Sequence, residues 1–137
     1  MKLVPVPTPN VADTWVHWWP WLSACAKHNG ENASDYVRDL RDGTRQIHLL
    51  WDPDTKRCHG IVGTEILTNL RGDKICHLIW TTGKGRQDWQ GLIVELERWA
   101  REHVGCKVMK ATARPGWRPH LKAHGYRVRH IIAHKDL

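Results

Sequence analysis

Residues 74–110 read KICHLIWTTGKGRQDWQGLIVELERWAREHVGCKVMK, and this stretch decides the fold of the chain. Residues 75–80 form an apolar run that favours a pleated, buried strand. Residues 81–85 include two glycines, which let the backbone turn sharply. The apolar residues between 88 and 104 follow helical spacing, Gly105 ends that helix, and residues 107–111 can form another strand. The stretch therefore predicts a βαβ unit.

The turn between the first strand and the helix is also a candidate anion site. It brings backbone N–H groups and the positive end of a helix to one point, and Asp88 can cap that helix. Lys84 and Arg86 add positive charge to the same loop. The turn therefore favours a phosphate group, although a glycine turn that merely links a strand to a helix has the same signature.

The segments before this stretch supply further strands and helices. Residues 3–6, 46–51 and 58–67 read as strands, and prolines restrict the first of them to a sheet edge. A first helix is expected over residues 11–27, with Asn10 as its cap and with Pro20 bending or splitting it. A second helix should begin at Asn32 or Ser34 and end at Gly43.

The segments after it should add a short helix over residues 117–123 and a last strand over residues 126–134. The order is therefore strand, two helices, three strands, helix, strand, helix, strand. This order predicts a single domain, residues 1–137, of the α/β (α+β) class. Its central mixed sheet should be largely antiparallel and flanked by helices.

The composition indicates a folded, basic protein without a membrane span. No apolar run is long enough to cross a bilayer, and residues 1–10 lack the apolar region of a secretory signal. Three of the four cysteines lie in or beside apolar runs, where reduced cysteine behaves as a small hydrophobe. A reducing, cytoplasmic location is therefore expected.

The net charge of +7 and the nine tryptophans raise the question of partners. A basic surface attracts nucleic acid, and tryptophan can stack on bases. The sequence contains no known DNA- or RNA-binding motif besides its positive charge, so nucleic acid is the less favoured partner. Tryptophan more often fills cores and interfaces, and a protein partner bound through exposed tryptophans is an alternative.

The order and lengths of the elements resemble the GNAT (Gcn5-related N-acetyltransferase) superfamily over nearly the whole chain. Residues 86–91, RQDWQG, are similar to the R/Q-x-x-G-x-G/A loop of that family. Arg86 and Gly91 stand at its first and last positions, and Trp89 replaces its middle glycine. Without that glycine the backbone approaches a pyrophosphate less easily if the Trp89 side chain points toward it, and just as well if it points away.

The second half is also similar to small GNAT-like proteins of tailed bacteriophages. The shared features are a tryptophan before the long helix, a Gly-Cys pair after it, and three dipeptides near the end. These dipeptides are residues 116–117, 125–126 and 136–137. This resemblance places the protein in a host cytoplasm or in a virion.

The GNAT resemblance implies that acetyl-CoA is a cosubstrate and that an amine or protein of unknown identity accepts its acyl group. The fourth and fifth strands of the family's sheet splay apart, and the pantetheine arm lies in the gap. The strand end offers it backbone groups, and the loop holds the pyrophosphate. The implied cofactor-binding residues are Trp80, Thr81, Thr82, Arg86, Gln87, Asp88, Trp89, Gln90 and Gly91.

Acetylation needs a base that deprotonates the amine, and His77 on the central strand is one candidate, because histidine exchanges protons near neutral pH. Glu65 on the preceding strand is the second. Either residue can equally be an ordinary strand residue without a catalytic role. The resemblance puts Leu121 where the family often has a tyrosine that protonates the leaving thiolate. Leucine cannot donate a proton, so a slow enzyme is expected.

The sequence allows two other interpretations besides catalysis. The first is a GNAT-fold protein that has lost catalysis and serves as a binding or structural part, in a phage particle or in host takeover. The second is a metal site, and the pairs that raise it are Cys25 with His28, Cys58 with His59, and Cys76 with His77. Adjacent residues of a strand point to opposite faces, so no metal is expected.

Overall fold

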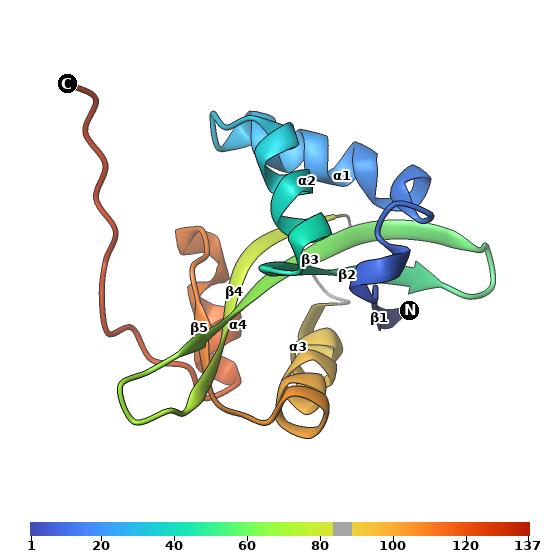
Figure 1. The fold of residues 1–137 in the computed structure, drawn as a ribbon. Coiled ribbons are helices and arrows are strands. Elements are labelled where there is room, and N and C mark those ends of the chain that lie inside the picture. The colour runs from blue at the N-terminus through green and yellow to red at the C-terminus, as the bar shows by residue number, and fades with distance from the viewer. Residues whose placement is uncertain (84–88) are drawn as a thin grey trace.

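The computed structural model describes residues 1–83 and 89–137 of the chain (Figure 1). The strands are β1 (Lys2–Pro5), β2 (Arg45–Asp52), β3 (Arg57–Thr68), β4 (Lys74–Gly83) and β5 (Cys106–Ala111). The α-helices are α1 (Trp15–His28), α2 (Ala33–Asp42), α3 (Trp89–Trp99) and α4 (Arg118–Ala123). Two short 3-10 helices are η1 (Thr8–Asn10) and η4 (Pro115–Trp117), and η3 (Ala100–Val104) is a π-helix that continues α3.

The five strands form one sheet in the order β1-β2-β3-β4-β5. The first four are antiparallel to their neighbours, and β5 runs parallel to β4. Helices α1 and α2 cover one face of the sheet and α3 covers the other (Figure 1). The expected α+β fold, with a mixed and largely antiparallel sheet between helices, is confirmed. So is the βαβ unit of residues 74–111, because α3 connects the parallel strands β4 and β5.

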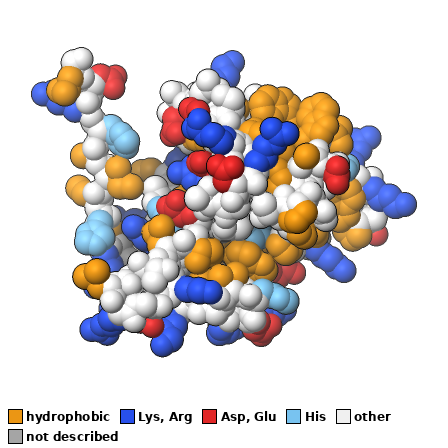
Figure 2. Space-filling view, in the orientation of Figure 1, with side chains coloured by type: hydrophobic (Ala, Val, Ile, Leu, Met, Phe, Trp, Pro, Cys, Tyr) orange, Lys and Arg blue, Asp and Glu red, His pale blue; other side chains and the backbone are white. Residues whose placement is uncertain are grey.

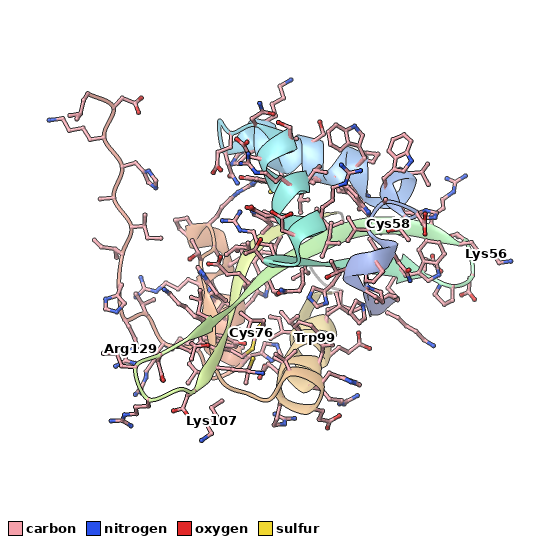
Figure 3. The ribbon with its side chains drawn as sticks, viewed as in Figure 1. Lys56, Cys58, Cys76, Trp99, Lys107 and Arg129 are labelled. Carbon is pink, nitrogen blue, oxygen red and sulfur yellow. The ribbon has the colours of Figure 1, made fainter. Side chains whose placement is uncertain are left out.

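The α3 face of the sheet is held by an apolar core. Leu92 and Leu96 of α3 pack on Leu50 and Leu78 of the sheet, with Trp99 at the border of the cluster. These are the positions that helical spacing predicts to face the core. A second small cluster around Cys76 continues this layer beneath η3, and Figure 3 labels both Cys76 and Trp99 there.

A β-bulge in β4 divides that strand into two parts. The register passes from Gly63 opposite Trp80 to Thr64 opposite Leu78, so Ile79 is an extra residue. Leu78 therefore packs in the α3 core, whereas Trp80 packs in the core beneath α1 and α2. Simple alternation would put these two side chains on the same face. Gly63 permits this arrangement, because a Cβ at that position would collide with the Trp80 ring.

Helix α1 differs from the expected helix in two respects. Residues 11–14 form a turn, and the helix begins at Trp15 after Thr14 instead of after a cap at Asn10. Pro20 does not split α1, which continues to His28. Proline removes one backbone hydrogen bond there, while Trp18 and Leu22 on either side are buried and hold the helix to the sheet.

Helix α2 has the ends that the sequence predicts. The Asn32 side chain accepts a hydrogen bond from the Ser34 N–H, and Gly43 ends the helix in the left-handed conformation with φ 78°. Its buried residues Tyr36 and Leu40 face the sheet.

Two predictions about strands are wrong. Residues 81–83 do not belong to the turn but continue β4, because Thr81 and Thr82 pair with β3. Residues 126–137 form no strand, and the sheet has β1 as its fifth member instead. The C-terminal segment runs away from the body of the molecule (Figure 1), and Arg129 lies on it (Figure 3). Glycine at position 125, with φ 86°, turns the chain out of α4.

Within the described residues, no helix has both the length and the apolar character that a bilayer span needs.

Candidate active site

Strands β4 and β5 lie side by side only over part of their length. Their last paired residues are Leu78 and Ala111, and the Thr112 N–H then donates to the Leu78 carbonyl at 3.0 Å. Strand β4 continues to Gly83 with β3 as its partner, whereas β5 ends. The sheet therefore opens between the two strands beyond Leu78, as the resemblance implies. Ligands commonly bind at the carboxyl ends of parallel strands where such strands part.

Three polar side chains meet at this opening on the face of α1 and α2. Glu65 and His77 are direct neighbours across β3 and β4. The Glu65 Oε1 atom lies 2.8 Å from His77 Nδ1, and the Thr112 Oγ1 atom lies 2.7 Å from His77 Nε2. The two candidate bases therefore contact each other, and His77 has hydrogen-bond partners at both ring nitrogens. With Nδ1 protonated, His77 donates a hydrogen bond to Glu65 and accepts a hydrogen bond from the Thr112 hydroxyl at Nε2.

Arg45 extends this polar row across the sheet. It lies opposite Glu65 on β2, and its Nε atom lies 3.6 Å from both Glu65 Oε2 and Asp39 Oδ2. Its guanidinium also lies over the Trp80 ring, at 5.3 Å from the ring centre. Trp80 in turn stacks on Tyr36 of α2. These contacts leave Glu65 and His77 partly exposed, with side-chain exposures of 24% and 13%, respectively.

An apolar cavity of about 20 Å³ lies on the α3 side of the opening. Its lining residues are Val62, Leu78, Thr81, Leu92, Ile93, Leu96, Ala113, Trp117 and Leu121. Leu121 of α4 therefore faces the cavity, so the position that the resemblance equates with the acid tyrosine points to this opening. Thr112 and Ala113 are consecutive residues, and they join the polar cluster to the apolar cavity.

The expected cofactor-binding residues divide into three groups. Thr81 lines the cavity, and Trp80 and Thr82 lie on the part of β4 that extends beyond β5. Trp89, Gln90 and Gly91 form the start of α3. Arg86, Gln87 and Asp88, together with the expected cap at Asp88, lie outside the described residues. The Trp80 side chain is 4% exposed and packs beneath α1 and α2, so only its backbone faces the opening.

Sequence reasoning missed Thr112, Ala113 and Arg45. The signal for Thr112 was its place directly after a strand that runs parallel to the central one, at the edge where ligands bind in parallel sheets. Arg45 gave no such signal, because its contact with Glu65 depends on the register of β2 and β3.

The cysteines and histidines proposed as metal pairs do not assemble in the described residues. No group of three or more His, Cys, Asp or Glu side chains there is placed to hold a metal ion. All four cysteines are free, and burial raises the pKa of the Cys76 thiol to about 12.

The sequence matches no protein-family model and no curated protein. The fold matches solved structures over the full chain. A probable acetyltransferase superposes with a TM-score of 0.73 at 14% identity, over 100% of this chain and 97% of that one. A ribosomal-protein-alanine N-acetyltransferase from Brucella melitensis biovar Abortus 2308 has a TM-score of 0.68 at 12% identity, over 100% and 99% of the two chains.

A glucosamine-6-phosphate N-acetyltransferase from Arabidopsis thaliana superposes with a TM-score of 0.65 at 11% identity, over 98% of this chain and 97% of that one. Identities this low carry the fold and not the substrate. The chain therefore has the fold of GNAT-type acetyltransferases, with a five-stranded mixed sheet that opens between β4 and β5.

Proposed function

We propose that the protein is an acetyl-CoA-dependent N-acyltransferase whose reaction takes place where β4 and β5 part. The observation that carries this proposal is the meeting of two environments at one opening. An apolar cavity lies on the α3 side, and the Glu65–His77 pair lies on the other. An acyl thioester needs an apolar channel for its arm, and an ammonium acceptor needs a base that removes its proton.

The acceptor amine would approach from the face of α1 and α2. Its ammonium group is attracted by the Glu65 carboxylate, and His77 takes the proton that must leave before the amine can attack the thioester carbon. The new C–N bond then forms as the C–S bond breaks. Leu121 cannot protonate the departing thiolate, so that proton must come from another group.

The acyl donor would occupy the α3 side. The pantetheine arm would run along β4 beyond Leu78, near the backbone of Trp80, Thr81 and Thr82. The cavity is narrow, so an arm would widen it by shifting Trp117 and Leu121 of η4 and α4. The pyrophosphate is assigned to residues 86–91 by the family resemblance, with Arg86 as its cation and the start of α3 as its dipole.

Binding of CoA tests this assignment directly. We expect acetyl-CoA and CoA to raise the thermal midpoint of unfolding, because a ligand that binds only the folded state stabilises it. Gly91→Trp should abolish the shift by blocking the start of α3, and Arg86→Ala should reduce it by removing a phosphate partner. Arg71→Ala, on the exposed turn between β3 and β4, is the matched control for loss of an arginine. An unchanged shift in both loop variants would refute the assignment.

A second candidate function is binding without catalysis. It is favoured by Leu121 at the acid position and by the exposed apolar residues Trp15, Val16 and Trp19 of α1, which are 56%, 59% and 36% exposed. Figure 2 shows apolar side chains gathered over this region. Such a protein would dock on a partner through α1, and the resemblance to phage proteins would make the partner a virion or host component. Absence of both CoA binding and turnover with a panel of amines would favour it.

A further inference from the structure

The three side chains Glu65, His77 and Thr112 form a chain of hydrogen bonds that proton abstraction from an amine does not need. To take a proton directly from an amine, His77 must first release one of its ring nitrogens from a hydrogen bond. Here the Nε2 atom of His77 faces a hydroxyl at 2.7 Å, and the Nδ1 atom faces a carboxylate at 2.8 Å. A carboxylate that orients a histidine, which in turn contacts a hydroxyl, is the arrangement that activates a nucleophile in acyl transfer.

We propose that Thr112 is an acyl-accepting nucleophile, activated by His77 and Glu65, so that the acyl group passes through a threonine ester. This inference rests on the proposed use of an acyl-CoA donor. It assigns a catalytic role to Thr112, whose exposed side chain stands at the point where β4 and β5 part. Its neighbour in the chain, Ala113, lines the apolar cavity. In this route the thioester carbon lies at the mouth of that cavity, on the side of Thr112.

These three residues and the substrate provide every proton and bond that the acyl transfer requires. The Thr112 Oγ1 atom attacks the thioester carbonyl carbon, and its proton passes to Nε2 of His77. Glu65 stabilises the imidazolium through Nδ1–H. When the tetrahedral intermediate collapses, the C–S bond breaks and the Nε2 proton passes to the departing thiolate. An amine or water then attacks the ester carbon, and Thr112 regains its proton through His77.

This route also provides the acid that the leucine at position 121 cannot be. The Leu121 side chain at the cavity has no proton to give, so in either route the departing thiolate takes its proton from another group. In the route through Thr112, the imidazolium of His77 carries the proton that the thiolate needs. The same residue thus acts first as base and then as acid, as the histidine of a hydrolase triad does.

The test is a search for the threonine ester with two acyl donors. The wild-type protein is mixed with acetyl-CoA without any amine, and separately with p-nitrophenyl acetate, which needs no CoA site. The reaction is quenched in acid and measured by intact mass and peptide mapping. We expect a burst of released thiol or nitrophenolate that matches the protein concentration, and one acetyl group on the peptide that contains Thr112. Alkaline hydroxylamine should remove this ester but not acetyl groups on lysines, and neutral hydroxylamine, which cleaves thioesters, should leave it in place.

Four variants define the chemistry. Thr112→Val removes the hydroxyl and keeps the shape, and it should lose the burst and the adduct. Thr112→Ser should keep both. His77→Gln should slow formation of the ester by about 10²–10⁴-fold, the range of general base catalysis. Thr68→Val, an exposed threonine at the C-terminal end of β3 and outside the hydrogen-bonded cluster, is the matched control and should behave as the wild type.

The variants should fold, because the Thr112 side chain is exposed and its N–H bond to Leu78 belongs to the backbone. Equal thermal midpoints check this. The nucleophile role is overturned if neither donor gives an ester on Thr112, or if Thr112→Val keeps the burst and the acetyl adduct. Activation by His77 is overturned if His77→Gln forms the ester as fast as the wild type. A Thr112 ester from p-nitrophenyl acetate alone would retain the nucleophile and remove acetyl-CoA from the proposed function. Turnover of acetyl-CoA with an amine and no ester would do the reverse.

Discussion

His48 is a buried polar residue in the core beneath α3. Its Nε2 atom lies 3.1 Å from Thr64 Oγ1, and that hydroxyl donates to Gln46 Oε1 at 3.1 Å. Because the Thr64 hydroxyl already donates its hydrogen bond to Gln46, the protonated Nε2 atom of His48 must donate a hydrogen bond to Thr64. The Nδ1 atom has no hydrogen-bond partner among the described residues. The His48 ring packs edge to face with the Trp99 ring, and the two ring centres lie 4.4 Å apart.

This environment makes the stability of the protein depend on pH. Burial lowers the pKa of His48 from 6.5 to about 3, so the folded state keeps it neutral while the unfolded state binds a proton below pH 6.5. The His48 contribution is therefore present in full above pH 6.5 and is lost as the pH falls toward 3. Its slope is at most about 1.4 kcal/mol per pH unit.

We predict that His48→Gln flattens the pH dependence of the free energy of unfolding between pH 6.5 and 3. Glutamine can still donate to Thr64, but it does not titrate. Urea unfolding at a series of pH values measures the slope for wild type and variant. His134→Gln, on the exposed C-terminal segment, is the control and should keep the wild-type slope. Equal slopes in wild type and His48→Gln would mean that His48 is protonated as readily in the folded state as in the unfolded one.

At the scale of single elements, α3 shows how the buried positions of an apolar period contribute to the free energy of unfolding. Leu96 is 2% exposed and packs with Leu92 on the sheet, whereas Val94 on the same helix is 46% exposed. Removing buried methyl groups loses their transfer free energy and leaves a cavity, while the exposed valine loses little contact.

Leu96→Ala should lower the free energy of unfolding by about 2–5 kcal/mol, and Val94→Ala by less than about 1 kcal/mol. Both substitutions place alanine in the same helix, so the difference between them measures burial and not helix propensity alone. Chemical denaturation monitored by circular dichroism gives both values. Similar losses in the two variants would contradict the packing of α3 described here.

Strand β4 shows what a period of two cannot predict. The apolar run of residues 75–80 indicates a strand, and the strand is present. The extra residue Ile79 then moves Trp80 to the opposite core from Leu78. A bulge depends on how two strands pair, and neither strand alone carries that information.

At the scale of the whole molecule, the C-terminal segment is separate from the sheet and its helices. Val128, Ile131 and Ile132 are 59%, 88% and 65% exposed, and Figure 2 shows the segment standing out from the body. Tyr126 is different, because it is partly buried and its N–H donates to the Leu121 carbonyl. Burial also raises the pKa of its hydroxyl.

Removal of residues 128–137 should therefore change the free energy of unfolding by no more than about 0.5 kcal/mol, as for other surface changes. A shorter chain that ends at Ala123 also loses Tyr126 and its bond to Leu121, and it should be less stable. Thermal and urea unfolding of the two truncated proteins compare them. A large loss on removing residues 128–137 alone would mean that this segment packs on the folded protein in solution.

The sequence by itself determined the type and order of most elements. Apolar periods of two and 3.6, with the cap at Asn32 and the stops at Gly43 and Gly105, are local properties of the chain, and the elements follow them. The strand predicted over residues 126–134 is absent because a strand depends on more than local properties of the chain. Strand residues need a partner, and alternation of side chains does not supply one.

Tertiary structure alone decided the candidate site. Glu65, His77 and Thr112 are separated by 12 and 35 residues, and their contacts arise from the register of β3 on β4 and from the end of β5 beside β4. Register depends on the pairing of strands that are distant in the chain. For that reason the sequence could name His77 and Glu65 as separate candidates, whereas only the folded sheet brings them together with Thr112.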